Sequence, residues 1–285
     1  MRKIIENKTF DEERALYGSK ELLIKNVSFD GSADGESAVK ECEDIEVEGC
    51  FCNLRYPFWH VRGLKISGTE MTEYCRAALW YSRDIRISSS KLHGIKALRE
   101  CAAVKIDNCD ILSPEFGWST DGIEMTDSTA ESEYFMLRAK NINFKNVKFK
   151  GKYSFQYIEN ATFENCSFDT KDAFWHGNNI VVKDSVIKGE YFAWYSKNLT
   201  LVNCKIIGTQ PFCYCTGLKL INCSMEGCDL AFEKSQATAE ITTKVDSIKN
   251  PYEGVITVPE VGEIIRDDPK SNGKIIIKSV ECAVK

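Results

Sequence analysis

The chain has no long apolar run. None of its 285 residues form a stretch able to cross a membrane, and residues 1–7 lack the apolar core of a signal peptide. Basic residues are not in excess either, because the formal net charge is −5 and lysines are scattered among acids. We therefore expect neither a membrane nor a nucleic acid as partner. Without a secretion signal, the 13 cysteines indicate reduced thiols and a cytoplasmic protein.

Metal-binding spacings are also missing. Cys213, Cys215 and Cys228 lie close together in the sequence, but their spacing matches no zinc site. They are read as small core residues. No metal and no cofactor are expected, and the sequence does not indicate an oligomeric state.

What the sequence does contain is a repeat of about 19 residues. Its copies begin at Leu22, Ile45, Leu64, Ile85, Val104, Ile123, Ile142, Ala161, Ile180, Leu199 and Leu218. A period of this length is typical of solenoid proteins. A leucine-rich horseshoe has a similar period but needs a helical return segment, whereas the return here carries aromatic strand patterns.

Each copy has the same internal pattern. Counting its first apolar residue as offset zero, offsets zero and two alternate with polar residues, as in a strand with one buried face. Offset four holds residue types that tolerate a left-handed bend: Asn26, Gly49, Gly68, Ser89, Asn108, Asp127, Asn146, Asn165, Asp184, Asn203 and Asn222. Offset five holds small residues and offset seven is apolar. Stacked Asn amides at the bend are expected to hydrogen-bond from one coil to the next.

These patterns predict an all-β fold, a right-handed parallel β-helix of about eleven 19-residue coils. Three short strands per coil would stack into three parallel sheets. We expect one domain, with coils over 21–235, an N-terminal cap over 1–20 and a C-terminal strand cap over 236–285. The N-terminal cap is predicted to contain a helix from Thr9, its N-cap, to Tyr17, with Gly18 ending it.

The predicted third strand holds most of the aromatic side chains. Offset fourteen contains all five tryptophans: Trp59, Trp80, Trp118, Trp175 and Trp194. Offset fifteen contains His60, Tyr81, Glu100, Tyr157, His176, Tyr195, Tyr214 and Glu233. Because adjacent strand residues point to opposite faces, we expect offsets twelve and fourteen inside and offsets eleven, thirteen and fifteen outside. Arg99, Gln156 and Phe174 fit this assignment poorly. An outer face rich in aromatic residues indicates a binding surface.

The coil pattern resembles the pectate-lyase-like β-helix superfamily. More narrowly, the segments at 172–176, 189–196, 208–215 and 229–233 resemble an uncharacterised bacterial β-helix family, a domain of unknown function. The narrower resemblance implies no known activity. In the wider superfamily, polysaccharide substrates lie on the outer face of one sheet. Trp118-Ser119-Thr120-Asp121-Gly122 is similar to a stretch of polygalacturonases, but Ser119 replaces an Asn, and the other motifs of those enzymes are missing.

Three hypotheses follow from these observations. The chain binds or processes carbohydrate on the outer aromatic face, is a scaffold that binds a protein there, or is an enzyme acting on a small cytosolic metabolite. We expect the ligand-binding residues to be His176, Tyr195, Tyr214, Glu233, Asp172, Gln210 and Asp229. Asp229 and Glu233 lie about 13 Å apart on an extended strand, beyond the carboxylate separation that glycosidases use.

Overall fold

The computed structural model describes residues 2–32 and 35–278, and every regular element in these ranges is a β-strand. No helix in this part of the chain could span a membrane. The predicted parallel β-solenoid is confirmed, with about 14 turns. Two compact units, Met1–Gly151 and Lys152–Lys285, make up the chain. Each unit is described by itself.

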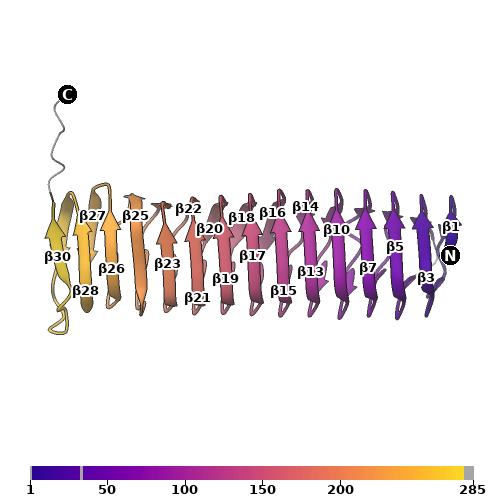
Figure 1. The fold of residues 1–285 in the computed structure, drawn as a ribbon, viewed down its shortest axis with the longest axis horizontal. Helices are drawn as coiled ribbons and strands as arrows, with labels where there is room; N and C mark the ends of the chain where they lie inside the picture. Colours follow the sequence, from indigo (N-terminus) through magenta and orange to yellow (C-terminus); the bar gives the residue numbers. More distant parts are fainter. Residues whose placement is uncertain (1, 33–34, 279–285) are drawn as a thin grey trace, which may run out of the picture. The chain divides into compact units, whose positions relative to one another are not determined.

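The first strand of each turn belongs to a parallel sheet. In the first unit its strands are β1 (Lys3–Glu6), β3 (Lys20–Lys25), β5 (Glu43–Glu48), β7 (Arg62–Ser67), β10 (Arg83–Ser88), β13 (Ala102–Asp107), β15 (Asp121–Thr126) and β17 (Lys140–Lys145). Figure 1 shows these strands side by side and pointing the same way. The second unit continues the pattern with β19 (Glu159–Glu164), β21 (Asn178–Lys183), β23 (Lys197–Val202), β25 (Leu218–Glu226), β26 (Gln236–Ile241), β28 (Glu253–Val258) and β30 (Lys274–Ile277). Strands pair in register, so that Ile85 lies opposite Leu64 and Val104.

A second, shorter strand follows each bend. In the first unit these strands are β2 (Thr9–Phe10), β4 (Ser28–Phe29), β6 (Phe51–Cys52), β8 (Glu70–Met71), β11 (Lys91–His93), β14 (Asp110–Leu112), β16 (Thr129–Glu133) and β18 (Lys148–Lys152), the last of which ends just past the unit boundary. In the second unit they are β20 (Ser167–Lys171), β22 (Val186–Lys188) and β24 (Lys205–Ile207). The single strand β25 covers both positions of its turn.

The bend between these two strands confirms the sequence prediction. All eleven residues at offset four have φ between 46° and 60°, which is the left-handed region. Side chains also connect successive bends, since the Asn203 amide donates to Asp184 at 2.9 Å and the Asn222 amide donates to Asn203 at 2.9 Å. The small residues at offset five are buried, and so are the twelve cysteines in the described ranges, all of them free.

The N-terminal segment corrects one expectation. Thr9 to Tyr17 forms strand β2 and turns instead of a helix. β1 pairs with β3, and β2 pairs with β4, so the segment from residue 3 to residue 19 forms a further coil. The reason lies in two residues that the repeat requires: Asn7 takes the bend conformation at φ 53°, and Phe10 stacks on Phe29 at 6.0 Å. Lys3 lies at offset zero, where the other copies have an apolar residue, so this copy was not recognised from the sequence.

The C-terminal segment likewise adds coils rather than only covering the last one. β26, β28 and β30 pair in parallel in that order and extend the sheet of the second unit. Strands β27 (Val245–Lys249) and β29 (Val261–Ile265) pair beside them. The expected final strand is present as β30. Because these copies lack the Asn bend pattern, the count of eleven coils from sequence was too low.

The predicted third strand is extended in only a few places. Strands β9 (Leu79–Trp80) and β12 (Leu98–Arg99) pair with each other, and a single bridge joins Arg99 to Trp118. In the regular coils of the second unit the same segment is a series of turns, with positive φ at offsets eleven, thirteen and fifteen, for example at Tyr153, Phe155 and Tyr157. Side chains therefore do not alternate as they would in a strand.

This backbone overturns our assignment of inner and outer faces. Offsets twelve and thirteen both point into the core, so that Phe155, Phe174 and Phe212 are fully buried. Offset fourteen lies at the surface boundary: Gln156, Trp175 and Trp194 are half-buried. Offset fifteen points outward, as predicted. Gln156 and Phe174 did not fit the predicted alternation because this segment is a series of turns and not a strand.

Candidate functional site

Four rings of the second unit form one continuous ladder at offset fifteen. Tyr157, His176, Tyr195 and Tyr214 lie one coil apart, with ring centroids separated by 4.8, 4.9 and 4.7 Å. The planes of neighbouring rings differ by only 8°, 6° and 9°. The spacing follows from the backbone, because the N–H of each of these residues donates to a carbonyl of the next coil at 2.7 to 3.0 Å.

Ring stacking leaves the edges of the ladder free for ligand contacts. Neighbouring rings cover one another's faces, while Tyr157 and Tyr195 are still 49% and 42% exposed. No described residue forms a hydrogen bond with the side chains of Tyr157, His176, Tyr195 or Tyr214. Burial and the nearby Glu233 raise the pKa of Tyr214, so its phenol is a neutral hydroxyl at neutral pH. The ladder is therefore a line of polar edges that can donate and accept hydrogen bonds.

Tryptophans of the same unit support this ladder from the inner side. Trp175 and Trp194 stack with centroids 5.4 Å apart and planes 5° apart. Their indole N–H groups donate to the backbone carbonyls of Tyr191 and Gln210 in the next coil, at 2.7 and 2.8 Å. Because these contacts fix both indoles, the tryptophans form a rigid, half-buried support beside the ladder.

Glu233 does not continue the ladder, contrary to our prediction. An extra residue shifts the register in this coil, so the Tyr214 N–H donates to the Glu233 carbonyl at 2.7 Å, where Tyr195 donates to Cys213. Positive φ values at Leu230, Phe232 and Lys234 repeat those at Gln210, Phe212 and Tyr214. Lys234 is thus the residue that takes the ladder position.

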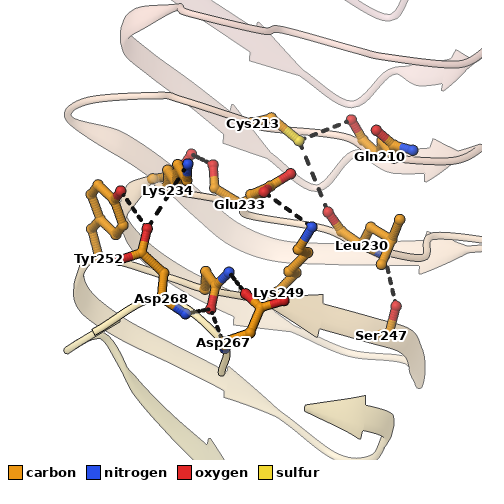
Figure 2. Close-up of polar contacts among 12 residues, drawn as sticks. Gln210, Cys213, Leu230, Glu233, Lys234, Ser247, Lys249, Tyr252, Asp267 and Asp268 are labelled. Carbon is orange, nitrogen blue, oxygen red and sulfur yellow. Dashed lines mark hydrogen bonds and ion pairs between the residues drawn. The ribbon is translucent and has the colours of Figure 1, made fainter. Parts of the chain in front are cut away.

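A network of charged and polar side chains follows the ladder (Figure 2). The Lys249 ammonium lies 3.2 Å from the Glu233 carboxylate, and the Tyr252 hydroxyl donates to Asp268 at 2.9 Å. Lys234 lies 3.9 Å from the same Asp268. Hydrogen bonding to the Lys270 N–H and to Tyr252 lowers the pKa of Asp268. Since these groups satisfy one another, we assign the network a structural role.

Asp172 is only 6% exposed, so the structure places it beneath the surface rather than on it. Burial raises the pKa of its carboxyl, partly opposed by the charge of Lys171 and reinforced by that of Glu190. Lys171 itself forms an ion pair with Glu190 at 2.7 Å. Asp172 therefore lies four residues before His176 in the same coil without sharing its exposed surface.

The remaining two predicted residues are Gln210 and Asp229, which contact neighbouring residues in different ways. The backbone carbonyl of Gln210 accepts the Trp194 indole N–H. Asp229 accepts a hydrogen bond from the Thr209 hydroxyl. Of the seven predicted site residues, the structure brings His176, Tyr195 and Tyr214 into one exposed ladder. The other four are not members of the ladder, although the Glu233 carboxylate lies close enough to Tyr214 to raise the pKa of its hydroxyl.

The ladder also contains Tyr157, which was in the sequence column but not among the predicted site residues. The repeat itself was the available signal, because Tyr157 precedes His176 by one 19-residue period. Lys234 was missed because the one-residue shift has no signature in composition. In the described ranges, no three His, Cys, Asp or Glu side chains are grouped as a metal site would require.

The first unit carries a different version of these columns. Trp59 and Trp80 stack at 5.8 Å, and the Arg99 guanidinium lies 5.3 Å from the Trp80 ring and 5.1 Å from the Trp118 ring. At offset fifteen, His60 contacts Tyr81 edge-on at 5.1 Å. Arg99 lies between two indoles, so this stack is held by cation–π contacts as well as ring packing.

Solved structures with a similar fold are distant in sequence. The A-module of mannuronan C-5 epimerase AlgE4 from Azotobacter vinelandii is 10% identical, with a TM-score of 0.30 over 96% of this chain and 89% of that one. The catalytic domain of a GH87 alpha-1,3-glucanase is 12% identical, with a TM-score of 0.29 over 96% of this chain and 63% of that one. QnrB1, a plasmid-mediated fluoroquinolone resistance protein, is 13% identical, with a TM-score of 0.21 over 71% of this chain and 81% of that one.

No curated protein matches this chain. A family model does, over residues 3–278, which is nearly the whole sequence. The expected membership of an uncharacterised family is confirmed: the chain belongs to DUF3737, a family of proteins of unknown function.

Proposed function

We propose that this protein binds a neutral oligosaccharide along the ladder of Tyr157, His176, Tyr195 and Tyr214. The observation that carries the proposal is the line of four unpartnered polar edges at intervals of 4.7 to 4.9 Å. A regular row of donors and acceptors suits an extended ligand with repeated hydroxyl groups. Tyrosine contributes both a rigid apolar ring and a polar tip, which is why it is common in binding surfaces.

The mode of contact differs from flat stacking of a sugar on an aromatic ring. Because each ring face is covered by its neighbour in the ladder, hydrogen bonds from the edges are the main contacts available. The half-buried Trp175 and Trp194 keep the ladder rigid, which reduces the entropy lost on binding.

Binding fits this arrangement better than hydrolysis. Glycoside hydrolysis requires two carboxyl groups about 5 to 9.5 Å apart. Glu233 forms an ion pair with Lys249, Asp229 accepts a hydrogen bond from Thr209, and Asp172 is buried. None of these predicted carboxylates is presented along the ladder. The cytoplasm stays our expected compartment, so the ligand we propose is an intracellular oligosaccharide.

The test is binding to a glycan array, followed by titration of any neutral oligosaccharide that binds. Tyr195→Phe and Tyr214→Phe keep the stacked rings and remove only the hydroxyls. Each lost hydrogen bond is worth about 0.5–1.5 kcal/mol, so each variant should bind about 2- to 10-fold more weakly. Tyr74→Phe is the matched control, because Tyr74 is 63% exposed and lies in the first unit.

Two results would contradict the proposal. One is a wild-type protein that binds no neutral glycan on the array. The other is an affinity that Tyr195→Phe and Tyr214→Phe leave unchanged, or that Tyr74→Phe reduces equally. A protein partner captured through the same ladder, with no glycan bound, would favour the scaffold hypothesis instead.

A further inference from the structure

A pocket of the first unit carries unbalanced positive charge. It has a volume of about 310 Å³ and is lined by His60, Val61, Arg62, Tyr81, Arg83 and Glu100. Arg62 begins strand β7 and Arg83 begins strand β10, and the two residues pair directly across the parallel sheet. Their backbones are therefore about 4.8 Å apart, so two guanidinium groups extend from neighbouring coils into the same pocket.

At several other positions of this unit, neighbouring coils place opposite charges next to each other. Lys65 pairs with Glu46 at 2.7 Å, Lys105 with Glu124 at 2.9 Å, and Lys91 with Glu70 at 3.3 Å. Arg62 and Arg83 instead lie opposite each other with like charges, an arrangement that is destabilising in a sheet. No described residue forms an ion pair or a side-chain hydrogen bond with either guanidinium.

Two acids near the pair, Glu43 and Glu100, are engaged with other cations. Glu43 lies opposite Arg62 in the sheet, but its carboxylate is 2.6 Å from Lys20. On the other side, Arg83 faces the uncharged Ala102. Glu100, which lines the pocket, accepts a hydrogen bond from Arg99 Nε at 3.1 Å. Hydrogen bonding to Glu100 also raises the pKa of Tyr81.

The other wall of the pocket is formed by the rings of Tyr81 and His60, and His60 adds a further hydrogen-bond donor. His60 and Tyr81 contact each other edge-on, with centroids 5.1 Å apart, so their positions are fixed. No described residue hydrogen-bonds the His60 side chain. Arg86, three residues further along β10 and outside the pocket lining, also lacks an ion-pair partner in the described ranges and lies between Lys65 and Lys105 in the sheet. The pocket lining itself thus contains two arginines and one acid, Glu100.

We propose that this pocket binds the oxyanion group, a carboxylate or a phosphate, of a small polar ligand. Arg62 and Arg83 bind the oxyanion oxygens, and His60 contributes a third hydrogen bond. Arginine suits this role because its planar fork of donors matches the oxygens of carboxylate and phosphate. An anion between the two guanidinium groups also removes the repulsion that the fold otherwise imposes. This site is separate from the ladder and does not depend on the function proposed there.

The test uses inorganic phosphate and glucuronate as two separate probes, each titrated into the full chain by calorimetry. At least one of them should bind and raise the melting temperature. Arg62→Gln and Arg83→Gln should each weaken that binding at least 10-fold, and the double variant should abolish it. Arg83→Lys keeps the charge and loses the fork, so it should bind more weakly than the wild type but more strongly than Arg83→Gln.

Arg76→Gln is the matched control, because Arg76 is an exposed arginine of the same unit outside this pocket. It should leave phosphate and glucuronate affinity unchanged. In the empty pocket Arg62 and Arg83 repel each other, and Arg83→Gln removes that repulsion. Without ligand, this variant should therefore melt at or above the wild-type temperature. The proposal is overturned if neither probe binds at millimolar concentration, or if the double variant binds as well as the wild type.

Discussion

At the scale of single residues, the bends depend on side chains that accept a left-handed backbone. Asn203 has φ 53°, donates to Asp184 and accepts from Asn222. A β-branched side chain is strongly disfavoured in this region of φ. The repeat placed Asn, Asp, Ser or Gly at all eleven bends, which is why the sequence alone predicted their positions.

Asn203→Val should lower the free energy of unfolding by about 1–3 kcal/mol, the usual cost of a residue held in a disfavoured backbone region. Asn203→Gly removes the same amide contacts without the backbone strain, so its loss should be clearly smaller. Urea denaturation of both variants checks this. Equal losses for Val and Gly would mean that the amide contacts, and not the backbone, decide stability at this bend.

Asp172 lies in an environment that disfavours its charged form, because its carboxyl is buried. Its pKa in the folded protein is above the ordinary value of 3.8, chiefly because of burial. A carboxyl with a raised folded pKa supports stability while protonated and loses that contribution as pH rises through the folded pKa. Asp172→Asn should therefore raise the melting temperature at pH 7, and the gain should shrink as pH falls towards 3.8. Thermal melts of both proteins across this range test it; a gain that grows on acidification contradicts the assignment.

At the scale of elements, the first two strands of each coil were predictable and the third segment was not. Alternation of apolar and polar residues defined β21 and its equivalents, because a strand with one buried face has a period of two. The third segment has no such period: Phe174 and Ala173 are consecutive and both buried. Alternating signs of φ produce this arrangement, and no residue type at these positions demands it as glycine or asparagine would.

The same limit explains the error at Glu233. A single extra residue between β25 and this segment shifts the coil by one position, so that Lys234 occupies the place of Tyr214. Assigning residues to equivalent positions from the sequence assumes a constant 19-residue period and therefore cannot detect such a shift. The ladder members His176, Tyr195 and Tyr214 were predictable because the three coils that carry them keep the 19-residue period.

The turn after β24 brings backbones of adjacent coils so close that only glycine fits. At Gly208, φ is 127°, and an added Cβ would lie 2.3 Å from the carbonyl oxygen of Gly189. Gly208→Ala should therefore cost about 2–5 kcal/mol through strain and the shift of a neighbouring coil.

Gly227 offers the matched control, because its φ is 60° and nothing lies within 4 Å of an added Cβ. Gly227→Ala should cost only about 1–2 kcal/mol, the penalty of the left-handed region itself. Denaturant unfolding distinguishes the two substitutions. Similar losses would show that the turn at Gly208 can move away from Gly189.

At the scale of the whole molecule, each coil contacts mainly its two neighbours, so stability is close to a sum over coils and their interfaces. The in-register pairing of β21 with β19 and with β23 shows why the period matters. If a complete period is removed, β23 can pair with β19 and keep every side chain on its proper face.

Deleting residues 180–198, which is one full period, should give a folded β-solenoid with a cooperative thermal transition. Deleting only 180–197 should not, because a one-residue slip moves buried side chains to the outer face. Far-UV circular dichroism and size-exclusion chromatography report both outcomes. If the two deletions behave alike, register between coils is not what specifies this fold.

The ladder of the second unit contributes one ring per coil, at a spacing that the backbone sets. The number of coils therefore fixes how many sugar residues can be contacted at once, independently of the chemistry of any one ring. Affinity for the proposed ligand should rise with each added sugar until the four rings are occupied and then stay constant. Selectivity for chain length can consequently change only in whole steps, by gain or loss of a coil, and the 19-residue repeat that builds the fold is also the unit in which such selectivity evolves.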